Sequence, residues 1–130
     1  MNQNHDDLPI EIKTGIEIFN EGFYFDAHEI MELRWVIDKS KFRNLYRGLI
    51  QLSAAFYHLD RGNTRGAIKL LKMAEENLAP YKNDGYSFDL PELLNEIQKL
   101  RAQISNSTAN GSVINQFGLI DIKIKILDKS

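Results

Sequence analysis

The chain has 130 residues and a formal net charge of −2, a length typical of one domain with a single core. It contains no cysteine, which excludes disulfides, thiolate metal sites and cysteine nucleophiles. No apolar run approaches the ~20 residues that cross a bilayer, and residues 1–7 lack the features of a secretory signal, so we expect a cytoplasmic protein without membrane contact.

The first three predicted helices follow from the spacing of apolar residues. Ile12, Ile16 and Phe19 recur at i, i+4 and i+7, which predicts a helix that begins near Pro9 and ends before Gly22. A second helix is predicted from about residue 24 to residue 38. A third, from about residue 42 to residue 59, is apolar on nearly all sides and is therefore expected to lie at the centre of the fold.

Two further helices are predicted in the second half of the chain. Asn63 or Thr64 caps a fourth helix, which has a single apolar stripe and ends at Pro80. Asp89 followed by Glu92 resembles a capping box and opens a fifth helix. The apolar stripe of the fifth helix consists of Leu90, Leu93, Leu94, Ile97, Leu100 and Ile104.

The chain divides into three predicted parts. Residues 1–105 form a single helical domain, residues 106–112 a polar linker, and residues 113–130 an extended C-terminal tail. In the tail, isoleucine alternates with charged residues, which is typical of a half-buried strand. These isoleucines are Ile120, Ile122, Ile124 and Ile126. We expect the tail to pack on its own chain or on a second copy.

A short pattern occurs twice and indicates how the helices pair. Gly22 and Ala27 recur 40 residues later as Gly62 and Ala67. Each glycine ends one helix, and each alanine lies near the start of the next, where a small side chain lets two helices approach closely. The predicted fold class is all-α, with about five helices in an antiparallel array or bundle: two helix hairpins plus a closing helix, followed by the extended tail or short strand.

The small net charge hides a basic segment. One acid, Asp60, lies among eight basic residues, which gives this segment +7 and the remainder of the chain −9. The basic residues are Lys39, Lys41, Arg43, Arg47, Arg61, Arg65, Lys69 and Lys72. They could form a face for nucleic acid or another anionic partner. Alternatively they are solvated or pair with acids on neighbouring helices, which the pI of 5.9 favours.

Polar residues interrupt the apolar surfaces of the second and third helices. His28, Glu32 and Trp35 share one face of the second helix at i, i+4 and i+7, with Glu29 beside them. Apolar residues on two sides indicate that this helix is mostly buried. A second polar stripe, on the third helix, consists of Arg47, Gln51 and His58. We predict that the two stripes face each other and form a buried site of paired polar groups.

Three interpretations of this site compete. In the first it is a structural network that fixes the helix register, with Trp35 as a core anchor rather than a stacking platform. In the second, His28 and Glu32 bind one metal ion, with His58 and either Glu29 or Gln51 completing the ligands. In the third, a histidine with a neighbouring Glu performs acid–base catalysis on a small molecule. No nucleophile or phosphate-binding loop supports a reaction class, so we expect no cofactor.

The same residues resemble a known family. Residues 19–35 contain Phe-Asn-x-Gly and Asp-Ala-His-Glu-x-x-Glu-x-x-Trp, and this run resembles the signature of a bacterial, archaeal and plastid family called domain of unknown function 309. Residues 47–58 and 63–71 resemble its second and third blocks, although the second block more often begins with Gln where this chain has Arg47. The resemblance spans about residues 12–100. It implies a compact all-helical domain and no established activity.

The sequence therefore favours a non-enzymatic binding or scaffold module that forms a homo-oligomer. The alternative is a metal- or ligand-dependent enzyme that uses His28, Glu29, Glu32 and His58. The sequence is also compatible with a small ligand or a metal ion as a binding partner. Nucleic acid is a less favoured partner, through the basic segment.

Overall fold

The computed structural model describes residues 8–83, 88–109 and 122–124. Among these residues the chain forms five α-helices and a short 3₁₀ helix, and no strand longer than an isolated bridge at Phe88. The elements are α1 (Ile10–Asn20), α2 (Tyr24–Ile37), α3 (Arg43–Asp60), α4 (Thr64–Leu78), η2 (Ala79–Tyr81) and α5 (Leu90–Ala109). The all-α prediction is confirmed. None of the described helices is both long and apolar enough to cross a membrane.

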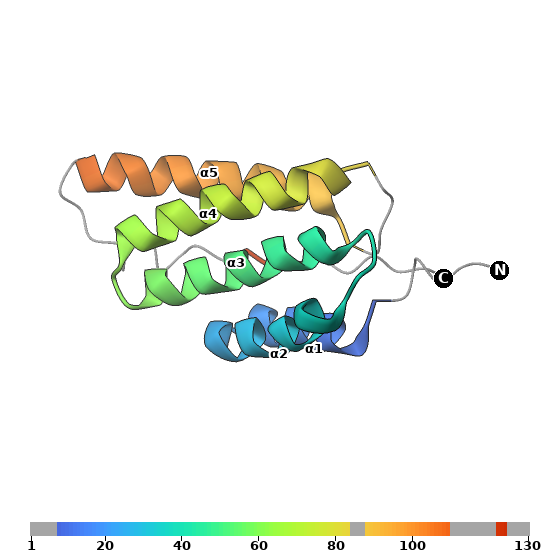
Figure 1. Ribbon diagram of the computed structural model, residues 1–130. Coiled ribbons are helices and arrows are strands. Elements are labelled where there is room, and N and C mark those ends of the chain that lie inside the picture. The colour runs from blue at the N-terminus through green and yellow to red at the C-terminus, as the bar shows by residue number, and fades with distance from the viewer. Residues whose placement is uncertain (1–7, 84–87, 110–121, 125–130) are drawn as a thin grey trace.

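The helices form two hairpins and a closing helix, as predicted (Figure 1). Gly22 and Gly62 have φ angles of 95° and 77°, a left-handed conformation that glycine adopts without steric cost. Ala27 and Ala67, five residues after each glycine, are fully buried. The repeated sequence pattern thus produces the same turn, followed by a buried small residue, in both hairpins.

A glycine inside each hairpin allows close packing of its two helices. A Cβ atom at Gly15 of α1 would lie 2.2 Å from Cγ of Met31 on α2. A Cβ atom at Gly48 of α3 would lie 2.8 Å from Cδ2 of Leu78 on α4. Real Cβ contacts are essentially never this short, so a side chain at either glycine would force its neighbour on the facing helix to move.

Helix α3 is the central helix, as its sequence predicts. It lies between α4 and the α1–α2 hairpin, and α5 packs against α4 (Figure 1). Most of its residues are buried, and Leu45, Leu49 and Leu52 are completely buried. All six members of the predicted apolar stripe of α5 are buried as well. The core is therefore continuous from α1 to α5.

Two predicted caps hold the starts of α4 and α5. The backbone N–H of Gly66 donates to Asn63 Oδ1 at 3.0 Å, and Asn63 is the cap of α4. The backbone N–H of Glu92 donates to Asp89 Oδ1 at 3.3 Å. Each cap satisfies an amide that has no partner within its helix.

The C-terminal region differs from the prediction at one boundary. Helix α5 continues to Ala109, through the first residues of the predicted linker at 106–112. Extending an established helix costs little per residue, so exposed polar positions after Ile104 remain helical. The rest of the linker lies outside the described residues.

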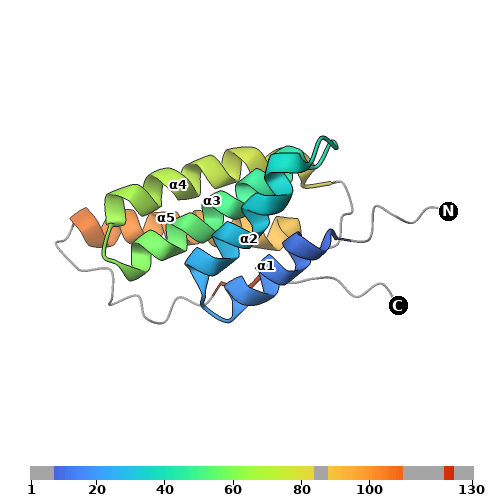
Figure 2. The ribbon, with the colours of Figure 1, turned by 60° about the horizontal axis from the view of Figure 1, so that its bottom comes forward.

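A short part of the predicted tail packs on its own chain. Ile122 and Ile124 are buried and Lys123 between them is exposed, which matches the predicted alternation. The Asn20 side chain donates from Nδ2 to the carbonyl oxygen of Ile124 at 2.9 Å and accepts from its N–H at 2.8 Å. The segment 122–124 therefore lies beside the end of α1 (Figure 2). Ile120 and Ile126 lie outside the described residues.

The prediction that α2 is mostly buried is wrong. Of its fourteen residues only Ala27 and Met31 are buried. Helix α2 lies at the edge of the array and packs against α1 and α3, so its outer side faces solvent. Apolar residues on that side therefore stay exposed.

Candidate functional site

The polar residues of α2 lie at its seam with α3. His28 and Trp35 are half-buried, and the Nδ1 atom of His28 and the Nε1 atom of Trp35 are buried without a hydrogen-bond partner. Glu32, between them on the helix, is also half-buried. Unpaired buried nitrogen atoms are rare because each loses its bonds to water.

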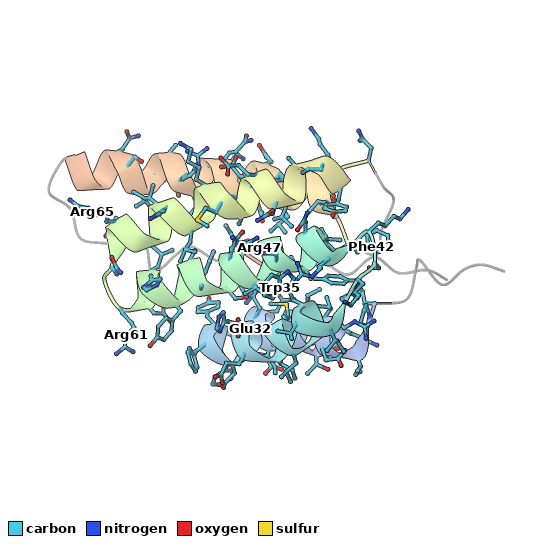
Figure 3. All side chains as sticks on the ribbon, viewed as in Figure 1. Glu32, Trp35, Phe42, Arg47, Arg61 and Arg65 are labelled. Carbon is cyan, nitrogen blue, oxygen red and sulfur yellow. The ribbon has the colours of Figure 1, made fainter. Side chains whose placement is uncertain are left out.

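Trp35 lies next to two arginines of α3, one of which, Arg47, is labelled in Figure 3. The guanidinium carbon of Arg43 is 4.2 Å from the centre of the Trp35 ring, and that of Arg47 is 5.7 Å away. Both distances are within the range of cation–π attraction. Trp35 is thus half-buried: it packs against the core and has two cations beside its ring.

The polar residues of α3 bond toward α4 and its cap. Gln51 is 7% exposed, and its Oε1 atom accepts from Asn77 Nδ2 of α4 at 2.7 Å. His58 Nδ1 is 3.2 Å from the Nδ2 atom of Asn63, the cap of α4. These residues therefore stabilise the α3–α4 hairpin.

The predicted network between α2 and α3 is not formed in the described part of the chain. Glu29 and Arg47 are exposed, and the residues of the two predicted stripes form no Glu–Arg, His–Glu or Gln–His hydrogen bond with one another in the described structure. The prediction fails because α4 supplies the amide that pairs with Gln51. Of the predicted site, the structure brings Trp35 and Arg47 together.

The two histidines are arranged around aromatic rings. The Phe25 ring is 5.8 Å from the His28 ring and 5.3 Å from the Tyr57 ring. The Tyr57 ring is in turn 5.8 Å from the ring of His58. Within the described residues, no three His, Asp or Glu side chains are grouped closely enough to hold a metal ion. The predicted ligand set His28, Glu32 and His58 therefore does not converge there.

The eight cations of the basic segment form no ion pair with the described residues. The ion pairs of the described chain use Arg34 and Arg101 instead. Four of the eight lie over aromatic rings: Lys41 over Phe42 at 5.2 Å, Arg43 and Arg47 over Trp35, and Arg61 over Tyr57 at 5.1 Å. Pairing with acids on neighbouring helices, one of the expected alternatives, is therefore not seen.

A polar cluster at the end of α2 was not predicted from the sequence. Asp38 is 5% exposed and accepts from Arg34 Nε at 2.9 Å, from the N–H of Ser40 at 2.8 Å and from Ser40 Oγ at 2.5 Å. Burial raises the pKa of Asp38, but the hydrogen bonds from Ser40 and Arg34 outweigh it and hold this pKa below its usual value. The pKa of Arg34 is raised by its hydrogen bond to Asp38. The i, i+4 spacing of Arg34 and Asp38 was the available signal.

Comparison with known proteins gives a family without an activity. Residues 12–70 match the family described as "Domain of unknown function (DUF309)". The chain is 36% identical over 94 residues to uncharacterized protein YpuF of Bacillus subtilis (strain 168), which covers 70% of this chain and 54% of that protein. It is 29% identical over 83 residues to an uncharacterized protein of Aquifex aeolicus (strain VF5), covering 63% of this chain and 25% of that protein.

The chain thus spans about half the length of the first relative and a quarter of the second. No solved structure matches it significantly. The matched segment runs from α1 into α4 and contains every residue of the predicted site. The resemblance to the family of unknown function 309 is therefore confirmed over residues 12–70.

Proposed function

We propose that this chain is a cytoplasmic, non-enzymatic binding module that pairs with a second copy of itself through the outer side of α2. The observation that carries the proposal is the exposure of large apolar side chains on α2: Leu33 is 64% exposed, Val36 63% and Ile37 62%. An apolar surface that is exposed to solvent does not stabilise a monomer, and exposed apolar patches of this kind mark interaction sites.

These side chains form one patch with the start of α1. Leu33, Val36 and Ile37 are spaced i, i+3 and i+4, so they share one side of α2. Ile10 of α1 is 68% exposed. Arg34 Nη1 lies 3.8 Å from Glu11 Oε1, which places the start of α1 beside the end of α2. We call Ile10, Leu33, Val36 and Ile37 the α2 apolar face.

The charges around this face support a second copy as the occupant. Asp26 is exposed in the first half of α2, and Lys39 and Lys41 are exposed just after its end. In an antiparallel pair with its two-fold axis at Leu33, residue 26 of one copy lies opposite residue 40 of the other. The half of α2 that carries the exposed acids Asp26 and Glu29 then faces the lysine-bearing end of α2 in its partner. A two-fold interface must be self-complementary in this way.

An aspartate or glutamate in the centre of the face tests the proposal. In Leu33→Glu the buried charge should abolish dimerisation, measured by analytical ultracentrifugation over a range of concentrations. The separated monomer should stay folded, with a melting temperature close to that of wild type measured at concentrations too low for the dimer, because surface substitutions usually change stability by less than about 0.5 kcal/mol. Ala102→Glu introduces the same charge at an exposed position of α5 and should leave the dimer intact. A wild-type chain that is monomeric at all concentrations contradicts the proposal.

A charge exchange tests the antiparallel arrangement separately. Asp26→Lys should weaken the dimer by about 2- to 30-fold, because a two-fold interface contains this ion pair twice and each exposed pair contributes about 0.2–1 kcal/mol. Adding Lys39→Asp to this variant should restore the affinity. If both single changes weaken the dimer and the double variant is weaker still, the pairing is not antiparallel about Leu33.

The enzyme alternative has no comparable observation in its favour. It requires Glu29 to join His28, Glu32 and His58, whereas Glu29 is exposed and these side chains are not grouped in the described structure.

A further inference from the structure

We propose that the seam of α2 and α3 binds single-stranded nucleic acid through a row of alternating cations and aromatic rings. The row consists of Trp35 with Arg43 and Arg47, and of Tyr57 with Arg61. It uses the side of α2 that faces α3, whereas the α2 apolar face is on the outer side. The inference therefore stands on different observations from the proposed dimer.

The positive charges of the row are not neutralised by acidic residues of the described chain. Arg43, Arg47 and Arg61 form no ion pair with the described residues, and they belong to the segment that carries +7. Glu32 is the acid of α2 on this side, and it forms no ion pair there either. Uncompensated arginines close together attract a phosphate backbone and release its counterions.

The aromatic rings point to nucleic acid rather than to an acidic protein. Arg43 lies 4.2 Å from the centre of the Trp35 ring and Arg61 lies 5.1 Å from that of Tyr57. Unpaired bases stack on aromatic rings and on the planes of guanidinium groups, so both members of each pair can receive a base. The carboxylates of an acidic protein would use the cations and leave the rings without a role. The bases of a duplex are already stacked, which favours a single strand.

The length of the row sets the length of the ligand. Arg43 and Arg61 are 18 residues apart, which is five turns of a helix, so they lie on the same side of α3 about 27 Å apart. A strand stacked as in a duplex rises roughly 3.4 Å per nucleotide, so this distance corresponds to at most about eight nucleotides, and a more extended single strand needs fewer. Figure 3 shows Trp35 and Arg47 at the α2–α3 seam and Arg61 at the far end of α3.

Trp35 provides a direct probe because the chain has one tryptophan. Oligonucleotides of deoxythymidine and of uridine, of about 4, 8 and 12 nucleotides, are titrated at low salt with tryptophan fluorescence and oligonucleotide anisotropy as readouts. We expect quenching of Trp35 and an affinity that rises steeply from 4 to 8 nucleotides and little beyond. Comparing the affinities for the deoxythymidine and the uridine oligonucleotides shows whether DNA or RNA is preferred.

Paired variants separate the row from the overall charge. Arg43→Gln with Arg47→Gln should reduce the slope of log affinity against log salt by about 1.4, since each phosphate contact on a single strand contributes about 0.7. Lys13→Gln with Lys99→Gln removes the same charge from exposed positions of α1 and α5 and should leave the slope unchanged. Trp35→Ala should weaken binding roughly 5- to 150-fold. Trp35→Phe keeps a ring and should retain most of the affinity.

Three results overturn the proposal. The first is the absence of anisotropy change with any oligonucleotide at low salt. The second is an equal loss of affinity in the two double variants, which would indicate binding by net charge alone. The third is displacement of the oligonucleotide by polyglutamate at equal charge concentration, which would assign the surface to an acidic protein partner. None of these results depends on whether the chain dimerises, because Leu33→Glu can be titrated in the same way.

Discussion

At the scale of single residues, Asp38 links the end of α2 to the loop that follows. Its carboxylate is buried and is stabilised by Arg34 and Ser40. Because its pKa is lower in the folded chain than in the unfolded chain, the charged form adds stability above the unfolded pKa. That stability is lost as the pH falls through the lower folded value.

Asp38→Asn should therefore reduce the free energy of unfolding by about 1–3 kcal/mol at neutral pH, since Arg34 loses its charged partner. The difference between variant and wild type should begin to shrink below the unfolded pKa of about 4, where the unfolded chain takes up a proton, and should disappear below the lower folded pKa. Urea unfolding at a series of pH values measures both effects. Asp60→Asn, at an exposed position, is the control and should stay within about 0.5 kcal/mol of wild type. A difference that is independent of pH would contradict this role of Asp38.

At the scale of elements, the separation of α1 and α2 depends on Gly15. A methyl group there would lie 2.2 Å from Met31 Cγ, so Gly15→Ala should cost about 1–3 kcal/mol despite the better helix propensity of alanine. Thermal unfolding measures the loss. Met31→Ala frees the space that the Gly15→Ala methyl group needs. The loss of stability in the double variant should therefore be smaller than the sum of the losses in the two single variants. Gly22→Ala meets no atom within 4 Å and suffers only from its φ of 95°, so Met31→Ala should not rescue it. Strictly additive losses for Gly15 and Met31 would show that the two do not clash.

Most elements could be predicted because their signals are local. The caps at Asn63 and Asp89 and the positive φ of Gly22 and Gly62 depend on a few neighbouring residues. The surroundings of α2 could not be predicted in this way. An apolar helix sequence predicts that the surfaces of the helix are buried against a partner. It does not show whether that partner belongs to the same chain or to another one.

The candidate site was predictable as a set of residues and not as a set of contacts. The i, i+4, i+7 rule correctly placed His28 and Trp35 at one seam, because it follows from helix geometry. The partner of Gln51 could not be predicted. Whether Gln51 bonds to Asn77 or to a residue of α2 depends on how three helices are rotated about their axes, which the sequence does not specify. The cations over Trp35 and Tyr57 were missed for the same reason.

At the scale of the whole molecule, each helix packs mainly against its neighbour in sequence, and residues 122–124, which follow α5 in the chain, contact the end of α1. Asn20 forms both backbone hydrogen bonds of Ile124. Asn20→Ala should cost about 1–3 kcal/mol because it leaves two buried backbone groups unpaired. Hydrogen exchange at the Ile124 amide should increase accordingly. Asn44→Ala, at an exposed position of α3, should leave both stability and exchange unchanged. Fast exchange at Ile124 in the wild type would show that the tail is not docked in solution.

The docking of the tail has a consequence for the kinetics of the fold. Contacts between successive helices form quickly, because little chain entropy is lost when they close. The contact between Asn20 and Ile124 spans 104 residues and is expected to form after the transition state. An interaction that is absent from the transition state slows unfolding and leaves the folding rate unchanged. The tail therefore lengthens the lifetime of the folded chain, and a chevron plot of Asn20→Ala should differ from wild type in its unfolding arm alone.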